Sequence, residues 1–240
     1  MDLGIRGRGA AVAAASSGLG LGAATVLAAE GARVVICGRD GARLDDAAAR
    51  VGHGCTPLVC DVSDAAGGTR FVEQAAEVLG DIDILVTNSG GPPPGTFASI
   101  GVDDYPVALE LNLMSVVAMC KAAVPGMQER RWGRVVAITS LAVRQPMANL
   151  ILSNTARAGV TGMLKTLARE VADQGVTVNS VQPGLHRTPR VTELYGDQTE
   201  GPIGDAGDFG AVVAFLCSEQ AKFLTGAQIH VDGGTYAALL

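Results

Sequence analysis

A glycine-rich turn that could hold a phosphate follows the first apolar segment of the chain. The segment Ala10–Ala15 has the length of a strand, and it runs into Ser16, Ser17, Gly18, Leu19 and Gly20, where a helical pattern begins. Glycines in such a turn let backbone N–H groups approach a phosphate at the positive end of a helix. The turn therefore predicts dinucleotide binding. The alternative interpretation is a turn that needs small residues for close packing alone.

The end of the second apolar segment, Arg33–Cys37, bears on which dinucleotide would bind. A carboxylate at this place would accept hydrogen bonds from both ribose hydroxyls and repel a 2′-phosphate. The chain has Gly38 there, followed by Arg39, whose guanidinium can hold a phosphate through charge-assisted hydrogen bonds. We therefore predict a preference for NADP(H) over NAD(H). In the alternative, Arg39 is solvated and Asp40 is the ribose ligand.

These residues need a scaffold, and the composition points to an α/β fold. The chain has 240 residues, 48% of them hydrophobic and 18% charged, which excludes intrinsic disorder and suits one substantial core. The net charge of −6, with no block of like charges, argues against nucleic-acid and membrane partners. Scarce aromatics and 32 Gly predict a core of small aliphatic residues packed near Gly-rich turns.

Strand-length and helical patterns alternate along the whole chain. Helical patterns separate the apolar segments; in one of them Ala156, Val160 and Leu164 share a face. This alternation predicts a Rossmann-type, doubly wound parallel sheet of about seven strands with helices on both faces, in one domain over 1–240. The predicted strands are Ala10–Ala15, Arg33–Cys37, Thr56–Cys60, Ile82–Thr87, Arg134–Thr139, Val176–Val181 and Ala227–Val231.

The cysteines and the N-terminus predict the compartment. Five Cys without any C-x-x-C pair indicate buried thiols in a reducing cytoplasm, with neither disulfides nor a metal site. Met1-Asp2-Leu3-Gly4 has no signal-peptide pattern, and no apolar run reaches the roughly 18 residues of a membrane helix.

Several motifs occur in an order that resembles a known family. They are the opening turn, Cys60-Asp61-Val62, Thr87-Asn88-Ser89-Gly90-Gly91, Asn112-Leu113-Met114-Ser115, Ile138-Thr139-Ser140, Val178-Asn179-Ser180-Val181-Gln182-Pro183-Gly184 with Thr188, Phe223-Leu224-Thr225-Gly226 and His230-Val231-Asp232-Gly233-Gly234. Over essentially its whole length the chain resembles the short-chain dehydrogenase/reductase family, most of all its 3-oxoacyl-acyl-carrier-protein reductase branch.

The resemblance implies roles for individual residues. The cofactor's phosphates would lie on Ala14, Ser16, Ser17, Gly18, Leu19 and Gly20, with Arg39 at the 2′-phosphate, Asp61 and Val62 at the adenine, Asn88 and Gly90 near the ribose, and Pro183, Gly184 and Thr188 at the carboxamide. The resemblance also implies a small-molecule or carrier-bound carbonyl substrate and a homo-oligomer, most simply a tetramer.

Two departures from the family pattern stand out. Ala14 replaces the first Gly of the turn, which is tolerable only where its φ stays negative. The second departure concerns the catalytic Ser, Tyr and Lys of the family: Ser140 stands at the Ser position, but Ser153 and Arg157 stand where Tyr and Lys are expected. The spacing of four keeps Ser153 and Arg157 on one helix face.

This replacement removes the usual acid. An aliphatic alcohol is a far weaker acid than a phenol, whose pKa is near 10, and Arg cannot relay a proton. We expect Arg157 to bind the ribose, and Ser140 and Ser153 to donate hydrogen bonds to a substrate oxygen. The proton would come through a water held by Asn112, or from His186. Alternatively, Ser153 is a helix N-cap and His186 an exposed loop residue.

Three functions remain open from the sequence. The first is an NADP(H)-dependent oxidoreductase that reduces a carbonyl or oxidises a secondary alcohol without the usual acid. The second is a dinucleotide-binding protein without turnover, and the third a non-redox enzyme of elimination or cyclisation. The segment from Thr188 to Pro202 is short for the lid that the family folds over its substrate, which suits a large or carrier-bound substrate.

Overall fold

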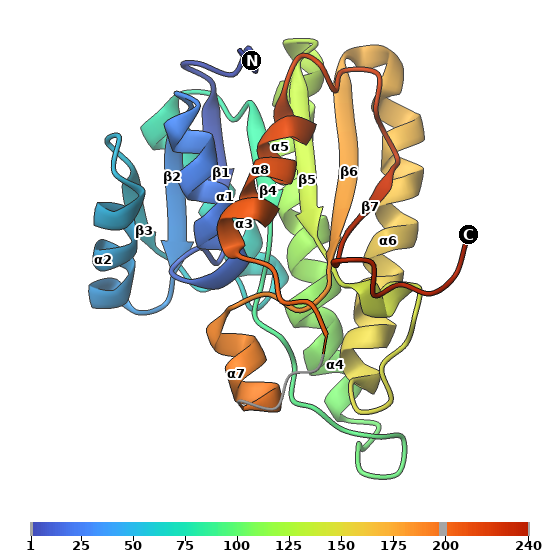
Figure 1. Cartoon of the computed structure of the whole chain (residues 1–240). Helices are drawn as coiled ribbons and strands as arrows, with labels where there is room; N and C mark the ends of the chain where they lie inside the picture. Colours follow the sequence, from blue (N-terminus) through green and yellow to red (C-terminus); the bar gives the residue numbers. More distant parts are fainter. Residues whose placement is uncertain (1, 197–200, 240) are drawn as a thin grey trace.

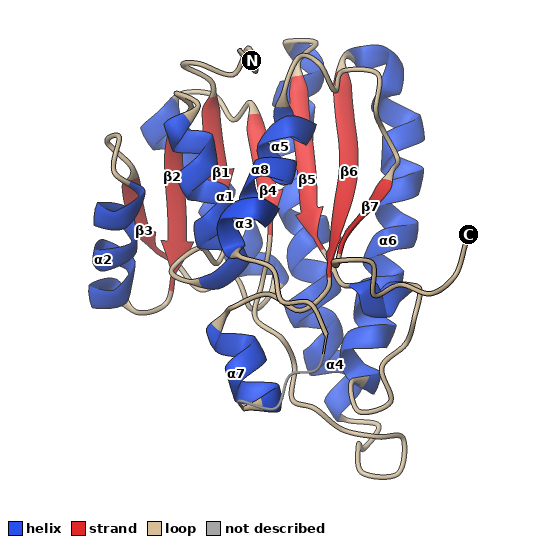
Figure 2. Ribbon diagram, in the orientation of Figure 1, coloured by secondary structure: helices blue, strands red, loops and turns tan. Residues whose placement is uncertain are grey.

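A computed structural model describes residues 2–196 and 201–239 of the chain. Seven parallel strands form one sheet in the order β3-β2-β1-β4-β5-β6-β7 (Figures 1 and 2). They are β1 Gly9–Val12, β2 Arg33–Gly38, β3 Thr56–Val59, β4 Ile84–Thr87, β5 Gly133–Ile138, β6 Val176–Pro183 and β7 Gln228–Val231. The predicted Rossmann-type sheet is therefore confirmed, and each predicted strand overlaps an observed one.

Helices cover both faces of the sheet. In chain order the helical elements are α1 Gly18–Ala29, α2 Gly41–Val51, α3 Ala65–Leu79, α4 Asp104–Leu109, η1 Glu110–Met114, α5 Ser115–Glu129, η2 Leu141–Val143, α6 Ile151–Val171, η3 Ala172–Gln174, α7 Pro189–Tyr195 and α8 Ala206–Cys217. One core lies between the sheet and α1, α2 and α8, and the other lies between the sheet and α3, α5 and α6. Most of the buried apolar side chains are Ala, Val, Leu and Ile, as the composition predicts.

Glycine lets α1 and α8 cross at very close range. A Cβ atom on Gly22 would lie 2.1 Å from the carbonyl oxygen of Ala206, and one on Gly210 would lie 2.4 Å from that of Gly22. Real Cβ atoms do not come this close to backbone atoms. The abundance of glycine is therefore needed for helix packing as well as for turns.

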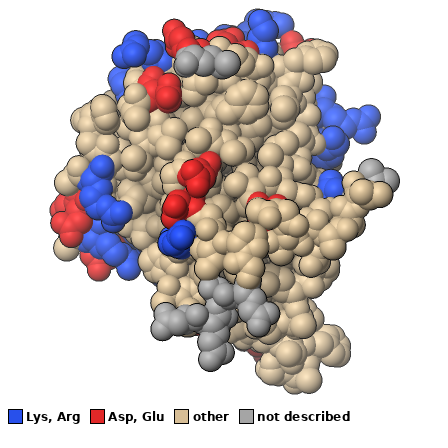
Figure 3. Space-filling model, viewed as in Figure 1, with Lys and Arg blue, Asp and Glu red and all other residues tan. Residues whose placement is uncertain are grey.

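The carboxyl ends of the strands meet at one edge of the sheet. Figure 1 shows the strand arrows pointing toward the same end of the molecule, where α7 and the loop after β4 also lie. Ligands of open α/β sheets bind at this edge. On the face seen in Figure 3, many charged side chains lie near the rim, and a smaller group of acidic and basic side chains lies near the middle among uncharged surface.

The helical stretch Asp104–Glu129 is apolar and long enough to cross a membrane by length and composition. The expectation that no segment reaches that length is therefore wrong for this stretch. Half of it is buried inside the protein, where α5 packs against α3 and the sheet. A core helix passes the same test, so packing accounts for its apolar character.

Candidate active site

The glycine-rich turn lies between β1 and α1, at the carboxyl edge of the sheet. Ser17 precedes the first residue of α1, and its side chain makes no capping hydrogen bond. Asn88, just beyond β4, donates a hydrogen bond from Nδ2 to the carbonyl oxygen of Ala14 over 3.1 Å. A Cβ atom on Gly20 would lie 2.9 Å from both of these atoms. Gly20 thus permits the close packing, while Ser17 and the start of α1 stay available to a phosphate.

Ala14 does not keep the negative φ that the sequence analysis required of it. Its φ is +47°, in the left-handed region that is costly for any residue with a Cβ atom. The backbone on both sides of it is held by neighbouring strands: the amide of Ala13 donates to Val86 O and that of Ala15 to Cys37 O. These bonds impose the conformation, and the chain tolerates an alanine there at the expense of local strain.

At the end of β2, an arginine without an acidic partner among the described residues lies next to a carboxylate that caps a helix. Arg39 is exposed and pairs with no acidic side chain of the described residues. The carboxylate of Asp40 caps α2 by accepting a hydrogen bond from the amide of Arg43 over 3.0 Å. This bond argues against Asp40 as the ribose ligand, because the cap already uses one of its oxygens.

Asp61 and Val62 follow β3 on the adenine side of the expected cofactor site. Val62 is buried, whereas Asp61 is exposed and accepts a hydrogen bond from the amide of Ser63. The Val62 side chain therefore packs into the protein interior, and the carboxylate of Asp61 faces solvent.

Ser140 follows β5 by two residues, and Ser153 and Arg157 lie on α6. Ser140 directly precedes η2, and its Oγ accepts a hydrogen bond from the amide of Ala142. Ser153 is 9% exposed, and Arg157 donates from Nη1 to Ile138 O at the end of β5 over 3.0 Å. This bond brings the guanidinium to the strand end that leads into Ser140.

Ser153 is not a helix cap. The N-cap of α6 is Leu150, and the helix begins at Ile151. Ser153 therefore lies within the first turn, where the expected capping role does not explain it. Ser153 and Arg157 are one turn apart on α6, as the spacing predicts.

Burial weakens the hold of Arg157 on its proton. Desolvation, together with the positive charge of Arg190, lowers the pKa of the Arg157 guanidinium to about 10. Arg157 is still a cation at neutral pH. Its charge is energetically unfavourable in the folded protein, because no acidic side chain of the described residues pairs with it.

Asn112 lies in η1, a π-helical turn between α4 and α5. Such turns are rare and often mark functional sites, which accounts for an Asn within an apolar helical stretch. Its Nδ2 donates to Ser89 Oγ over 2.6 Å and to Gly90 O over 2.7 Å. Its Oδ1 is buried and has no hydrogen-bond partner among the described residues, so it can accept a hydrogen bond from a water or a ligand.

His186 is not the exposed loop residue of the alternative interpretation. It is 2% exposed, its ring stacks edge-on against Phe209 with 5.4 Å between centroids, and its Nδ1 lies 3.1 Å from Gly184 O. Phe209 belongs to α8, whereas Arg157 lies on α6, which covers the opposite face of the sheet. The ring therefore has a packing role, and it is a poor candidate for the proton donor.

Thr188 connects the segment after β6 to the glycine-rich turn. Pro183 ends β6, Gly184 donates its amide to Val231 O, and the Thr188 side chain caps α7 through the amide of Val191. The Thr188 methyl group would lie 3.4 Å from a Cβ atom on Gly18. Thr188 thus lies where it can reach a phosphate on the turn.

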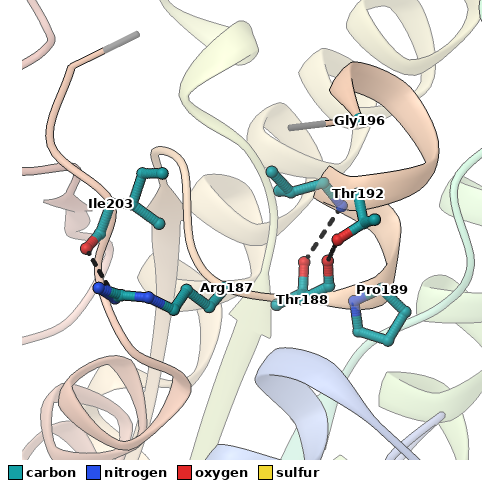
Figure 4. Close-up of a pocket in the computed structure, with 7 residues that line it drawn as sticks. Arg187, Thr188, Pro189, Thr192, Gly196 and Ile203 are labelled. Atoms are coloured by element: carbon teal, nitrogen blue, oxygen red, sulfur yellow. Dashed lines mark hydrogen bonds between the residues drawn. The ribbon is translucent and has the colours of Figure 1, made fainter. Parts of the chain in front are cut away.

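Thr188 also lines an open cavity of ≈ 510 Å³ between α7 and the segment around Ile203. Figure 4 shows Arg187 at its side, donating a hydrogen bond to Ile203 O. The expected lid is the short helix α7 with the chain that follows it, of which residues 197–200 lie outside the described residues.

Comparison with known proteins decides the family. The family profile described as enoyl-(acyl carrier protein) reductase matches residues 13–236, and with the 3-oxoacyl-[acyl-carrier-protein] reductase of Salmonella typhimurium the identity is 34%, over 96% of this chain and 98% of the relative. The chain belongs to the short-chain dehydrogenase/reductase family.

Two solved structures of this family extend the comparison. L-sorbose reductase from Gluconobacter frateurii, complexed with NADPH and L-sorbose, superposes with a TM-score of 0.92 at 30% identity, and the match covers 100% of both chains. A short-chain oxidoreductase from Pseudomonas aeruginosa that contains an atypical catalytic center superposes with a TM-score of 0.89 at 29% identity, over 98% of this chain and 99% of that one. The chain is thus an oxidoreductase by family.

One residue at this site was missed by the sequence analysis. Arg190, on α7, lies against Gly91 and donates from Nη2 to Pro92 O over 2.7 Å. A signal was present in the sequence: residues 88–102, 139–169 and 176–192 contain no Asp or Glu. Only the fold shows that these acid-free segments converge.

Proposed function

We propose that this chain is an NADP(H)-dependent oxidoreductase that reduces a carbonyl, or oxidises a secondary alcohol, at a site in which Ser153 and Arg157 replace Tyr and Lys. The substrate would be a small molecule or a carrier-bound carbonyl, as in the 3-oxoacyl-acyl-carrier-protein reductases. The observation that carries the cofactor assignment is Arg39, an exposed guanidinium at the end of β2 without an acidic partner among the described residues.

The donor set fits a dinucleotide phosphate. Ser17 leaves its hydroxyl unused at the N-terminus of α1, and nothing lies within 4 Å of a Cβ atom placed on Gly90, so there is room beside the end of β4. Ala14, Ser16, Gly18, Leu19 and Gly20 would form the phosphate-binding turn. Asp61 and Val62 would lie at the adenine, and Asn88, Pro183, Gly184 and Thr188 would complete the site.

A bound NADPH would supply the hydride, and the chain itself must supply hydrogen bonds and a proton. We propose that Ser140 and Ser153 donate hydrogen bonds to the substrate oxygen, and that Arg157 holds the ribose hydroxyls and stabilises the developing negative charge. The unpaired Oδ1 of Asn112 would hold the water through which the proton arrives.

A second function is favoured by the missing phenol. With Ser153 on α6 at the Tyr position, a bound dinucleotide would have no strong general acid beside the substrate. The same site could bind the cofactor without turnover, or serve a non-redox elimination or cyclisation.

Nicotinamide fluorescence separates these functions. Titration with NADPH and NADH gives the two dissociation constants, and the loss of NADPH fluorescence on addition of a panel of ketones reports turnover. For a reductase we expect turnover, with the variants Ser140→Ala, Ser153→Ala and Arg157→Ala each slower than the parent. NADPH binding without turnover of any ketone would favour the second function.

The wider setting is part of the proposal. We propose that residues 1–240 work as a single NAD(P)-binding domain in a homo-oligomer in the cytoplasm, without nucleic-acid or membrane partners. The cysteines support the compartment, because all five are free and four of them are buried.

A further inference from the structure

A second guanidinium, that of Arg190, lies beside the candidate active site. Arg190 extends from α7, beyond β6, to the loop beyond β4, where it bonds Pro92 O. A Cβ atom on Gly91 would lie 2.9 Å from its Nε and Nη2 atoms, so the guanidinium rests directly on the glycine backbone. Since β5 lies between β4 and β6, this side chain crosses the strand end that leads to Ser140.

Three of the chain segments that lead to this site carry no carboxylate. Residues 88–102, 139–169 and 176–192 carry no Asp or Glu, although the chain as a whole has a net charge of −6. Arg190 pairs with Glu193 of its own helix over 3.0 Å, but that glutamate is 66% exposed, so the pair is weak. Asp232, which follows β7 at the same edge of the sheet, accepts hydrogen bonds from the amides of Gly234 and Tyr236.

The positive charges of Arg157 and Arg190 repel one another, and among the described residues no acidic side chain forms an ion pair with Arg157. The charge of Arg190 is one of the two causes that disfavour the Arg157 cation, so the two groups are close enough to interact. A desolvated cation beside a second cation is costly unless an anion accompanies it. In a molecule with a net charge of −6, such a pair of neighbouring cations attracts anions.

We propose that the carbonyl substrate carries a carboxylate, and that Arg190 binds it with Arg157 contributing the surrounding positive field. The proposal rests on the proposed function and names its substrate class: an oxo acid, reduced to the hydroxy acid. The carbonyl carbon would take the hydride, the carbonyl oxygen the proton, and the carboxylate would stay unchanged. A planar guanidinium matches a carboxylate through two parallel hydrogen bonds.

The cofactor is a second source of the same chemistry. Thr188, two residues before Arg190, lies near Gly18 of the glycine-rich turn, so the diphosphate of the dinucleotide is the other anion that Arg190 could meet. The experiment must separate a substrate carboxylate from a cofactor phosphate.

The test compares 2-oxobutanoate and 4-oxopentanoate, each beside its neutral amide, with NADPH consumption as the readout. For the parent we expect kcat/KM to favour at least one acid over its amide by about 10- to 100-fold, the range for a hydrogen bond to a charged group. Arg190→Met should abolish that preference by lowering kcat/KM for the acid alone, and Arg190→Lys should restore part of it. Arg50→Met, which removes an exposed charge on α2, is the matched control and should leave the preference intact.

Three results would overturn the inference. Equal losses for acid and amide in Arg190→Met would mean that Arg190 only fastens α7 to the loop after β4. A larger NADPH dissociation constant in that variant, with the preference for the acid unchanged, would mean that Arg190 binds a cofactor phosphate. A parent without any preference for an acid would also contradict it.

Failure of the proposed function is distinguishable from failure of this inference. If the parent binds NADPH but turns nothing over, calorimetric titration of the same four compounds into the protein loaded with NADP⁺ replaces the kinetic readout. Tighter binding of an acid than of its amide, lost in Arg190→Met, would support the carboxylate site in a protein that is not a reductase. Absence of such a difference would overturn the site itself.

Discussion

Ala14 is held at a φ of +47° by hydrogen bonds of its neighbours to β2 and β4, and this strain predicts a gain from glycine. The left-handed conformation costs an L-residue about 1–2 kcal/mol, part of which is offset by the greater freedom of glycine in the unfolded chain. We expect Ala14→Gly to raise the free energy of unfolding by up to about 1 kcal/mol, as measured by urea denaturation. Ala13→Gly, at a buried neighbour without positive φ, is the control and should lower it. A loss of stability in both variants would contradict the prediction.

Arg39 governs the choice of cofactor if its guanidinium meets the 2′-phosphate. Arg39→Asp removes the phosphate's partner and adds a repelling charge, so we expect NADPH affinity to fall by about 10- to 100-fold and NADH to become the preferred cofactor. Fluorescence titration with both cofactors measures the change. Arg43→Asp, an equal charge change at an exposed site within α2, should leave the preference unchanged. Equal affinities for the two cofactors in the parent would refute the assignment.

We expect the charge of Arg157 to lower the free energy of unfolding while it supports NADPH binding. Its pKa of about 10 in the folded protein lies well below that of a free guanidinium, so the unfolded chain binds the proton more tightly. We therefore expect Arg157→Met to raise the free energy of unfolding at neutral pH by about 1–3 kcal/mol while it weakens NADPH binding.

The pH dependence of stability checks the cause. Above a pH of about 10 the folded parent releases a proton that the unfolded parent still holds, so the free energy of unfolding rises with pH until the unfolded chain also releases that proton. The gap between variant and parent should therefore shrink as pH rises above about 10 in urea denaturation. A gap that stays constant with pH would show that packing, and not the charge, sets the difference.

At the scale of elements, α6 presents Ser153 and Arg157 to the site one turn apart. Ser153→Tyr with Arg157→Lys places a phenol and a relay-capable amine on the same face, near Ser140. General acid catalysis is worth about 10²–10⁴-fold, so we expect faster reduction of simple ketones by the double variant. The measurement is kcat with saturating NADPH. The acceleration requires that the tyrosine ring fit into the space around the buried Ser153 side chain.

The matched control is Ser153→Phe with Arg157→Lys, which adds the ring without the hydroxyl and should not accelerate the reaction. If the parent already turns over an oxo acid rapidly and the tyrosine variant loses that activity, the residues present form an adapted site of their own. We favour the adapted site, because Arg157 keeps a positive charge and Ser153 keeps a hydroxyl at the two positions.

At the scale of the whole molecule, exposed apolar side chains predict association. Phe97 and Val107 are 83% and 69% exposed, and Phe223 and Leu239 are fully exposed. So many large apolar side chains in contact with water are unusual for a protein that stays monomeric. We expect a homo-oligomer, most simply a tetramer, in sedimentation at micromolar concentration. A single 24.4 kDa species would contradict it. The C-terminal residues are described as far as Leu239, and Leu240 lies outside the described residues.

Much of the fold was determined by the sequence alone. Alternating strand and helix periods define a parallel α/β sheet because connections between parallel strands are right-handed and helices must cover both faces. The glycine-rich turn, Arg39 and the missing Tyr and Lys are also local features, legible from residue types and spacing. Each depends on short stretches of chain whose geometry is set by sterics and periodicity.

The tertiary structure decided the backbone conformation, the burial and the hydrogen-bonding role of residues that contact other segments of the chain. The positive φ of Ala14 comes from hydrogen bonds to β2 and β4, the burial of His186 comes from its contact with Phe209, and the role of Asp40 comes from the start of α2. The electrostatic interaction of Arg157 with Arg190 depends on sheet order, which brings the ends of β4, β5 and β6 together. Local patterns carry no information about such contacts, because the residues that make them are far apart in the chain and close only after folding.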